Sequence, residues 1–260
     1  MNSPTVTLNN GIEMPLLGLG VYAPQHNNEV QQAVEDALAF GCRLIDTAAG
    51  YGNEREVAQA VAASGLPRNE LFITTKVKNE DQGYESTLRA FDRSLELLQL
   101  DTVDLYLIHW PTSPHRLDTW RALENLYNEG RVRAIGVSNY YQPHLDELLN
   151  IATVVPAINQ VEFSPYCYRP DVLTYCRSKG IQLEGYAPLV RGLKQNDPKL
   201  VAISEKYGKS TYQVLVRWSL QHNVVTIPKS VKKERIQANF DVLDFELSAD
   251  DFDAMNTFYD

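Results

Sequence analysis

Residues 43–55, Arg43-Leu-Ile-Asp46-Thr-Ala-Ala-Gly-Tyr51-Gly-Asn53-Glu54-Arg, are the most informative segment of this 260-residue chain. The apolar start, Arg43–Asp46, predicts a short buried strand that ends in an acid. The small residues after it predict a loop, and Asn53 is expected to cap a helix with Glu54 in its first turn. An acid at a strand end, a tyrosine five residues on, and a lysine at the end of the next expected strand (Thr74-Thr75-Lys76) together indicate a site that moves a proton.

Apolar runs of strand length recur along the chain, most of them starting about 24 to 32 residues after the last, with helical patterns between them. Strictly alternating strands and helices predict a parallel sheet, and eight such units in this length predict an α/β fold of the (β/α)8 TIM barrel type. The expected strands are Leu16–Gly20, Arg43–Asp46, Leu71–Thr75, Val103–Ile108, Val132–Gly136, Ala157–Gln160, Ile181–Gly185 and Val224–Ile227. The expected helices include Glu29–Phe40, Glu54–Ala63, Tyr84–Leu98, Thr119–Asn128 and Thr211–His222, whereas Leu189–Leu200 is expected to be a loop.

Two further features concern the organisation of the chain. The segment Thr5-Val-Thr-Leu-Asn-Asn-Gly-Ile-Glu-Met predicts a β-hairpin with its turn at Asn9-Asn10-Gly11, and this hairpin is expected to cap the bottom of the barrel. No linker, low-complexity tract or sequence repeat divides the chain. Residues 1–260 are therefore expected to form a single domain.

The composition narrows the class of protein. Apolar residues make up 44% and charged residues 22%, as in ordinary globular proteins, and the formal charge of −9 argues against nucleic acid or an anionic membrane as the main partner. No apolar run reaches the length of a membrane span, and the first residues do not resemble an export signal. The odd number of cysteines, without metal-ligand spacing, favours a reducing cytoplasm. The cysteines are Cys42, Cys167 and Cys176.

One alternative fold has to be considered. Gly18-Leu-Gly20-Val-Tyr-Ala23 follows a predicted strand, and Asp46 ends the next, which is the layout of a Rossmann dinucleotide site. In that fold the helix begins within the glycine loop. Here Pro24-Gln-His-Asn-Asn intervenes, and the helix is expected to start near Asn28. The Rossmann interpretation also leaves the polar residues at the later strand ends without a function.

Polar residues stand at the ends of seven consecutive expected strands. Because the carboxyl ends of barrel strands form one mouth, these side chains are expected to converge there. Each of them taken alone has an ordinary structural explanation, such as a helix cap, a solvated charge or a core histidine. Together they favour a catalytic site. The residues are Asp46 with Tyr51, Lys76, His109, Ser138 with Asn139, Gln160, Tyr186, and Lys229 with Ser230.

The chemistry of these residue types points to protonation of a carbonyl. A free tyrosine has a pKa of about 10, and an ammonium about 4 Å away would stabilise its phenolate by up to roughly 4 kcal/mol at an effective dielectric of about 20. Lys76 is therefore expected to lower the pKa of Tyr51 by up to about three units, with Asp46 as its counter-ion. His109 is expected to orient a substrate oxygen or to help relay the proton. Such a site needs a hydride donor.

A basic cluster late in the chain suggests where that donor binds. Ile227-Pro-Lys229-Ser230-Val-Lys-Lys-Glu-Arg235 opens a helical pattern in an acidic protein, with Ser230 as the expected helix cap. Lys229 and Arg235 are expected to clamp a phosphate monoester, and Tyr186 to stack on a planar ring. A solvated basic helix and a core aromatic are the plainer explanations of the same residues.

The sequence resembles the aldo-keto reductase family, and in particular its bacterial and protozoan short-chain members. The resemblance rests on Asp46-Thr-Ala-Ala-Gly-Tyr51-Gly-Asn-Glu, Asp104-Leu-Tyr-Leu-Ile-His109-Trp-Pro, Gly136-Val-Ser-Asn-Tyr, Asn159-Gln-Val-Glu162 and Ile227-Pro-Lys-Ser230, and it covers almost the whole chain. It implies a cytoplasmic, monomeric oxidoreductase that uses NADPH/NADP+ to reduce a small aldehyde or ketone.

The resemblance also implies roles for individual residues. The catalytic residues would be Asp46, Tyr51, Lys76 and His109, with Tyr51 as the general acid. The cofactor would be bound by Gly20, Val21, Tyr22, Asp46, Ser138, Asn139, Gln160, Tyr186, Ala187, Leu189, Lys229, Ser230, Arg235 and Asn239, with Lys229, Ser230 and Arg235 on the adenosine 2′-phosphate. The substrate would contact Tyr22, Tyr51, Lys78, His109 and Trp110, and no metal is expected.

Several positions depart from the family pattern. Lys78 stands where relatives often have a tryptophan, which suggests a more polar pocket that favours anionic or hydroxylated carbonyl substrates. Val190 stands where a glycine is common, so the loop over the cofactor is expected to differ. The chain ends soon after Met255, and the connection after Trp110 looks short, so we expect an open pocket of broad specificity.

Two other functions stay open on the sequence alone. A regulatory protein could keep the barrel and NADPH as a redox sensor, although such a sensor needs no proton donor. A metal-dependent barrel hydrolase is a second possibility, but none of the five histidines forms a His-x-His pair at a strand end. These histidines are His26, His109, His115, His144 and His222.

Overall fold

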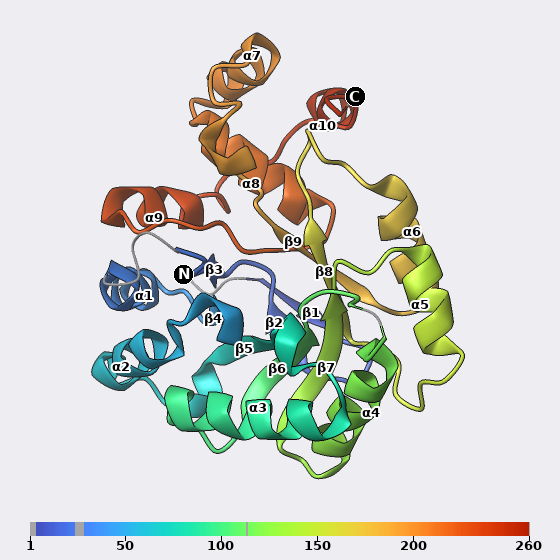
Figure 1. Cartoon of the computed structure of the whole chain (residues 1–260). Helices are drawn as coiled ribbons and strands as arrows, with labels where there is room; N and C mark the ends of the chain where they lie inside the picture. Colours follow the sequence, from blue (N-terminus) through green and yellow to red (C-terminus); the bar gives the residue numbers. More distant parts are fainter. Residues whose placement is uncertain (1–3, 24–28, 113, 260) are drawn as a thin grey trace.

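The computed structural model describes residues 4–23, 29–112 and 114–259. Eight parallel strands form a ring at the centre, in the order β10-β9-β8-β7-β6-β5-β4-β3, and helices surround it (Figure 1). The (β/α)8 fold predicted from the sequence is confirmed. The strands are β1 (Thr5–Thr7), β2 (Glu13–Pro15), β3 (Leu19–Gly20), β4 (Leu44–Asp46), β5 (Phe72–Val77), β6 (Val103–Ile108), β7 (Val132–Ser138), β8 (Ile158–Glu162), β9 (Gln182–Tyr186) and β10 (Val225–Thr226). The helices are α1 (Val30–Ala39), α2 (Glu54–Ser64), α3 (Tyr84–Leu98), α4 (Arg116–Asn128), α5 (Gln142–Leu149), α6 (Pro170–Ser178), α7 (Pro198–Tyr207), α8 (Thr211–Gln221), α9 (Lys233–Phe240) and α10 (Ala249–Met255).

Backbone hydrogen bonds close the ring between its first and last strands. The Gly18 N–H donates to the Thr226 carbonyl at 3.0 Å, and the Thr226 N–H donates to the Leu16 carbonyl at 2.8 Å. Parallel bridges join Leu17 to Thr226 and Gly20 to Lys229. The closed ring leaves neither of these strands with a free edge.

The glycines of the Rossmann-like motif lie in this closure. A side chain at Gly18 would come within 2.4 Å of the Leu44 side chain, and one at Gly20 within 2.9 Å of the Ile227 carbonyl oxygen. Both glycines therefore allow the first strand to approach its neighbours closely. Together with the strand order, this rules out the Rossmann alternative; the expected helix start near Asn28 lies outside the described residues.

Most barrel strands bury both of their faces, and β6 illustrates the division. Leu105 and Leu107 belong to the cluster inside the barrel, whereas Tyr106 and Ile108 belong to the larger cluster between the sheet and the helices. Side chains alternate along a strand, so residues two apart share a face. The run Val103–Ile108 is apolar except for Asp104, which is buried and paired with Arg68 and Arg133, and such a mostly apolar run is what two buried faces require.

The hairpin of β1 and β2 closes the lower end of the barrel, as predicted. Its turn residues donate side-chain hydrogen bonds to backbone carbonyls next to the amino ends of the strands: Asn10 to Arg133 at 2.9 Å and Asn9 to Pro156 at 3.0 Å. Leu8 and Met14 are buried against the interior cluster. The opposite end, where the strands finish, is left for the site.

Some boundaries differ from the expectations. The helix expected over Thr119–Asn128 begins at Arg116, and the strands β5, β7 and β8 extend beyond their expected ends. The segment expected to be a loop, Leu189–Leu200, contains the start of α7 at Pro198, where Asp197 accepts a hydrogen bond from the Lys199 N–H at 2.9 Å and caps the helix. Within the described residues, no helix is long and apolar enough to cross a membrane.

Asn53 occupies the cap position of α2, but its side chain does not cap the helix. Its amide donates to the Val21 carbonyl at 2.9 Å and accepts from the Thr47 hydroxyl at 2.7 Å. The expected capping role is therefore wrong, because these two contacts use the side chain to tie the loop after β4 to the end of β3. Glu54 does lie in the first turn, where it accepts a hydrogen bond from Thr75 at 2.6 Å.

Candidate active site

Strand alternation directs the predicted site residues into the upper barrel. Leu44 and Phe72 face the interior cluster, and Asp46 and Lys76 lie an even number of positions after them on β4 and β5. They therefore point to the same side. Lys76 is fully buried, although a lysine is almost never buried without a partner.

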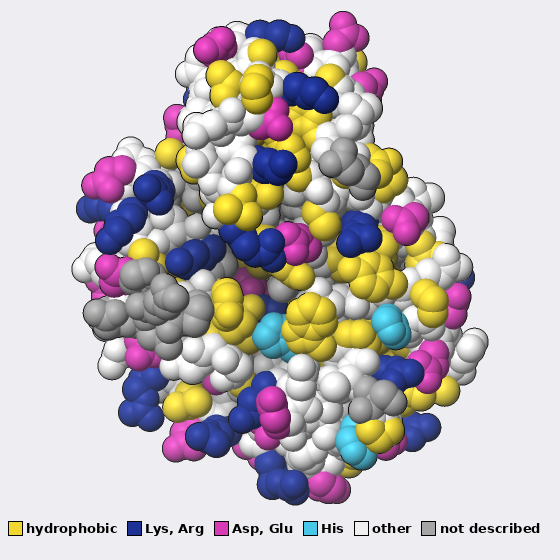
Figure 2. Space-filling view, turned by 45° about the horizontal axis from the view of Figure 1, so that its top comes forward, with side chains coloured by type: hydrophobic (Ala, Val, Ile, Leu, Met, Phe, Trp, Pro, Cys, Tyr) yellow, Lys and Arg dark blue, Asp and Glu magenta, His cyan; other side chains and the backbone are white. Residues whose placement is uncertain are grey.

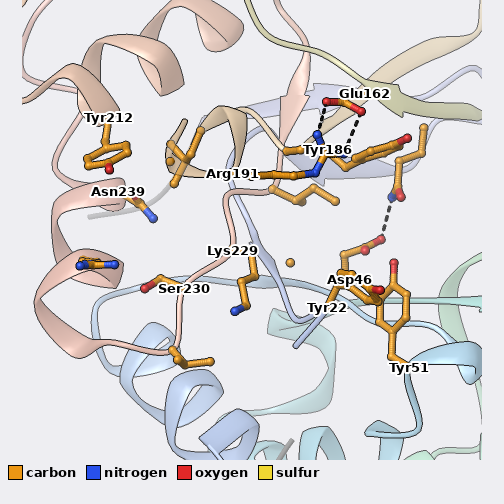
Figure 3. A pocket seen from close by; sticks show the side chains of 18 of the residues that line it. Tyr22, Asp46, Tyr51, Glu162, Tyr186, Arg191, Tyr212, Lys229, Ser230 and Asn239 are labelled. Carbon is orange, nitrogen blue, oxygen red and sulfur yellow. Dashed lines mark hydrogen bonds and ion pairs between the residues drawn. The ribbon is translucent and has the colours of Figure 1, made fainter. Parts of the chain in front are cut away.

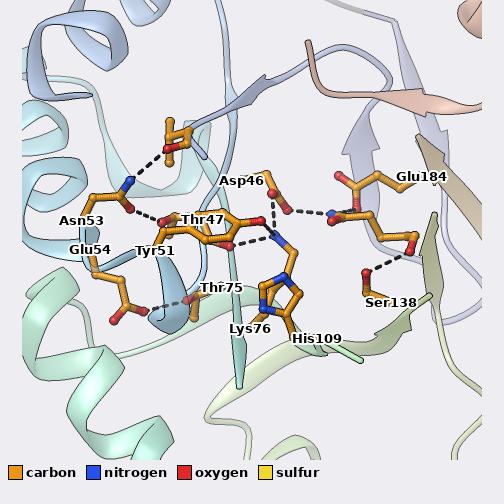
Figure 4. Close-up of polar contacts among 12 residues, drawn as sticks. Asp46, Thr47, Tyr51, Asn53, Glu54, Thr75, Lys76, His109, Ser138 and Glu184 are labelled. Atoms are coloured by element: carbon orange, nitrogen blue, oxygen red, sulfur yellow. Dashed lines mark hydrogen bonds and ion pairs between the residues drawn. The ribbon is translucent and has the colours of Figure 1, made fainter. Parts of the chain in front are cut away.

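The Lys76 ammonium has three oxygen neighbours (Figure 4). It donates to the Asp46 carboxylate at 2.6 Å and to the Thr47 carbonyl at 2.9 Å, and it lies 3.5 Å from the Tyr51 hydroxyl. Burial lowers the pKa of Lys76 and is the largest single effect, but the charge of Asp46, its hydrogen bond and the other nearby charges together outweigh burial, so the net pKa shift is upward. Lys76 therefore stays charged at neutral pH.

Tyr51 lies in the loop between β4 and α2, beside two other rings. Its ring centroid is 4.9 Å from that of Tyr22 and 5.5 Å from that of His109. Burial raises the pKa of Tyr51, and the opposing effect of Lys76 does not cancel it. The expectation of a lowered pKa for Tyr51 is wrong, because the desolvation of the phenolate raises the pKa by more than the Lys76 ammonium, 3.5 Å away, lowers it. Tyr51 is therefore a protonated hydroxyl near neutral pH.

His109 follows the end of β6 and lines the same cavity. Burial lowers the pKa of His109 to about 3, and the nearby charge of Lys76 adds to the shift. The imidazole is thus neutral near pH 7 and has one N–H donor and one acceptor. It can hold an oxygen by hydrogen bonding, but it carries no extra proton to give.

On the opposite wall, the polar side chains bond to one another. The Asn139 amide donates to the His109 carbonyl at 3.1 Å and to the Ser138 hydroxyl at 3.0 Å, and it accepts from Tyr186 at 3.0 Å. Ser138 donates to the backbone carbonyl of Gln160 at 2.9 Å. Asn139 has a φ of +63°, a left-handed conformation that asparagine tolerates better than most residues. The network fixes this wall before any ligand arrives.

These groups surround one elongated cavity of about 1000 Å³ at the carboxyl ends of the strands (Figure 3). In Figure 2 its hollow is bordered by Lys and Arg side chains on one side and by hydrophobic and His side chains on the other. Most of the residues predicted for the site line it. They are Gly20, Tyr22, Asp46, Tyr51, His109, Trp110, Ser138, Asn139, Gln160, Tyr186, Ala187, Leu189, Lys229, Ser230, Arg235 and Asn239.

Three predicted residues do not line the cavity. Val21 is packed in the core between sheet and helices, and Lys76 lies beneath the wall, where it acts on the cavity through its partners. Lys78 lies next to Gly50 at the rim, but its ammonium is 3.6 Å from the Asp81 carboxylate. The positive charge of Lys78 is thereby partly offset.

The basic end of the cavity differs in detail from the expectation. α9 begins at Lys233 with Lys232 in the cap position, so Ser230 is not the helix cap. The Ser230 hydroxyl instead accepts from the Lys232 N–H at 3.1 Å. Asn239 is 3% exposed, and its Nδ2 has no hydrogen-bond partner in the described structure. Figure 3 shows its amide directed into the cavity.

Sequence reasoning missed several residues of the site. Arg191 and Glu162 form a two-pronged ion pair across the rim at 2.7 and 2.9 Å, and Tyr212 lines the basic end. Arg191 and Tyr212 left no recognisable pattern in the sequence, whereas Glu162 stands in the motif Asn159-Gln-Val-Glu162. Glu184 is fully buried below the cavity wall on β9. Glu184 could have been noticed in the sequence, because an acid inside the expected buried strand Ile181–Gly185 needs hydrogen-bond partners in the protein interior.

No group of three or more His, Cys, Asp or Glu side chains is placed to hold a metal ion within residues 4–23, 29–112 and 114–259. Two ion pairs at the site are those of Lys76 with Asp46 and of Arg191 with Glu162.

Comparisons with known proteins agree with this geometry. A model of the aldo/keto reductase family matches residues 16–260. The glyoxal reductase of Bacillus subtilis is 54% identical over 252 residues, covering 97% of this chain and 91% of the relative. The 9,11-endoperoxide prostaglandin H2 reductase of Trypanosoma cruzi is 48% identical, covering 96% and 89%. An aldo/keto reductase structure from Brucella melitensis superposes with a TM-score of 0.95 at 44% identity, covering 99% of this chain and 100% of that one. A Bombyx mori aldo-keto reductase solved in complex with NADP gives 0.94 at 34% identity, covering 100% and 94%.

Proposed function

The chain belongs to the aldo/keto reductase family, and we propose that it reduces aldehydes and ketones to alcohols with NADPH, with Tyr51 as the proton donor. The observation that carries the proposal is the position of the Lys76 ammonium between the Tyr51 hydroxyl and the Asp46 carboxylate. This arrangement supplies a proton donor together with a charge that stabilises its conjugate base as it forms.

The proton step follows from these groups. Reduction adds a hydride to the carbonyl carbon and a proton to its oxygen, so the C=O double bond becomes a C–O single bond with new C–H and O–H bonds. NADPH, when bound, supplies the hydride. Tyr51 is protonated near neutrality and gives its proton to the oxygen; the phenolate then lies 3.5 Å from Lys76 until it regains a proton from solvent.

Asp46 and His109 support this step in different ways. Asp46 keeps Lys76 charged inside the barrel, where burial alone would favour the neutral amine. His109 is neutral, and its ring lies 5.5 Å from that of Tyr51, so one imidazole N–H can hold the same carbonyl oxygen that Tyr51 protonates. We assign His109 to substrate orientation rather than to proton transfer.

The residues at the basic end of the cavity fit a phosphorylated dinucleotide. Lys229 and Arg235 offer cationic donors of the kind that bind phosphate, and the unpaired Asn239 Nδ2 offers a donor to a base. At the other end, Tyr186 stands beside the fixed Asn139 amide, next to where a nicotinamide would meet Tyr51. The NADP complex of the Bombyx mori neighbour supports the same choice of cofactor.

The rim supports a small carbonyl substrate. Tyr22 and Trp110 are exposed aromatic side chains that line the same cavity as Tyr51, and they offer apolar contact area to a substrate. The relative from Bacillus subtilis is named glyoxal reductase, which also points to small carbonyl compounds. Because the Asp81 carboxylate partly offsets the positive charge of Lys78, we expect only a modest preference for anionic substrates.

The proposal is tested by NADPH consumption with a panel of small aldehydes. The wild type should turn over, and Tyr51→Phe should lose about 100-fold or more of kcat/KM, because a positioned general acid contributes that much. NADPH affinity should stay unchanged. Tyr84→Phe is the matched control, since Tyr84 is exposed on α3 and away from the cavity.

The other outcomes are equally informative. Equal turnover by the wild type and Tyr51→Phe would mean that another group donates the proton. No turnover by either protein, with NADPH still bound tightly, would favour the redox-sensor function over a reductase.

A further inference from the structure

A second buried acid lies beneath the reaction site and has no part in the steps above. Glu184 is on β9, fully buried, and the sheet register sets it directly beside Gln160 of β8. Its Oε2 accepts a hydrogen bond from Gln160 Nε2 at 2.9 Å, while its Oε1 has no partner within the described residues. A buried carboxyl is costly, so its position beside a cavity residue calls for a function.

The contacts of Gln160 show what Glu184 does. The Gln160 Nε2 donates to Asp46 Oδ2 at 2.8 Å and to Glu184 Oε2 at 2.9 Å. A glutamine amide nitrogen has two hydrogens, and the two acids use both of them. Turning the amide over would set its carbonyl oxygen against two carboxyl groups and leave both acceptors unpaired. The pair of acids therefore fixes the orientation of the amide.

This orientation limits what Gln160 can offer to a ligand. With both N–H groups used, only its carbonyl oxygen is left, and that oxygen accepts but cannot donate. We propose that Glu184 is a positioning residue that fixes Gln160 as a hydrogen-bond acceptor, so that the cavity selects a nicotinamide whose carboxamide offers an N–H. The inference rests on the proposed NADPH function and adds a reason for selectivity at the nicotinamide end.

The acceptor oxygen that Gln160 uses is present in both charge states of Glu184. Burial raises the pKa of Glu184, and the negative charge of Asp46 raises it further, against the effect of Lys76. A protonated carboxyl still has an oxygen that accepts from Gln160. A glutamine at position 184 would keep such an acceptor without an ionisable group, whereas a leucine would remove the acceptor and keep a similar volume.

The experiment compares two cofactors in two variants. Wild type, Glu184→Leu and Glu184→Gln are assayed with NADPH and with the reduced 3-acetylpyridine analogue of NADPH, in which an acetyl group replaces the carboxamide and has no N–H. The measured quantity is kcat/KM with NADPH divided by kcat/KM with the analogue. A general loss of structure would lower both values and leave the ratio unchanged. The affinity for 2′-phospho-ADP-ribose, which lacks the nicotinamide, should be the same in all three proteins.

We expect Glu184→Leu to reduce the ratio roughly fivefold, as for one neutral hydrogen bond, and Glu184→Gln to keep it. An unchanged ratio in a folded Glu184→Leu protein would overturn the inference, as would an equal reduction in Glu184→Gln. If the leucine variant does not fold, Glu184→Met carries the same comparison, because its thioether is a weak acceptor of similar length. A wild type that neither binds nor oxidises NADPH would instead refute the proposed function itself.

Discussion

Replacing Asp46 by asparagine should make the activity depend on pH in a new way. In the wild type the carboxylate 2.6 Å from Lys76 raises the pKa of the lysine above its ordinary value, so the ammonium persists across the working range. In Asp46→Asn that charge is gone, and burial alone should lower the pKa of Lys76 below its ordinary value of about 10.4. The lysine then loses its proton as pH rises, and Tyr51 loses the charge that stabilises its phenolate.

The size of the effect follows from the distance between Lys76 and Tyr51. At 3.5 Å an ammonium and a phenolate attract by about 5 kcal/mol at an effective dielectric of about 20. Tyr51 is only partly buried, so part of this energy is screened, and we expect kcat/KM to fall by about 100-fold to 1000-fold once Lys76 is neutral. At pH values where Lys76 is still protonated, most of that loss should be absent.

The assay is kcat/KM for one aldehyde from pH 5 to pH 10, with NADPH affinity measured at each pH because the amide also changes the contact with Gln160. The control is Asp104→Asn, which removes the negative charge of a buried side chain that pairs with Arg68 and Arg133 at the opposite end of the barrel. It should lower the melting temperature and leave the shape of the pH profile unchanged. If Asp46→Asn reduces the activity by the same factor at every pH, the assigned role of Asp46 is wrong.

Three other predictions follow from the structure. Because burial raises the pKa of Glu184, the unfolded chain releases this proton first, so stability falls as pH rises above about 4.3 and until the raised pKa is passed. Glu184→Gln should therefore raise the melting temperature more at pH 8 than at pH 5, and an equal change at both would contradict this. Arg235→Ala should weaken NADPH binding by about 10-fold or more and NADH binding only a little. Both affinities are measured by fluorescence titration, with the exposed Arg89→Ala as the control variant. Equal losses of NADPH and NADH affinity would mean that the phosphate does not bind at Arg235. Lys78→Met should reduce a preference for anionic over neutral aldehydes by no more than about fivefold, because Asp81 already offsets the charge, and a larger loss in kcat/KM ratios would show that Lys78 binds substrate directly.

The fold could be predicted because its signals are local. Most barrel strands are short runs that are buried on both faces, and β6 is found at the predicted residues. The polar residues at strand ends were equally visible, since a barrel collects them at one end. Helix caps were less predictable: the Asn53 side chain bonds to Val21, which is 32 positions earlier, and the Ser230 hydroxyl accepts from the Lys232 N–H before the helix begins.

The finer properties of the site depend on distances that a sequence does not contain. The expected pKa of Tyr51 had the wrong direction, because burial and a neighbouring charge oppose each other and only the structure gives their balance. The pairing of Arg191 with Glu162 joins the segment after β9 to the end of β8 through side chains 29 positions apart in sequence. Glu184 was visible as an acid in an expected strand, but its contact with Gln160 required the register of β8 and β9.

The closure of the ring has a consequence for how the protein is made. The bonds between Gly18 and Thr226 join residues roughly two hundred positions apart, so the loop they close is among the costliest in entropy. During synthesis the first barrel strand leaves the ribosome long before β10. Until β10 follows, the edge of the first strand that pairs with β10 in the folded protein has no partner. A topology with such distant contacts folds slowly, and the unpaired strand edge makes the nascent chain prone to aggregation. Production of this protein should therefore be sensitive to temperature and to the supply of chaperones, more than its final stability alone would indicate.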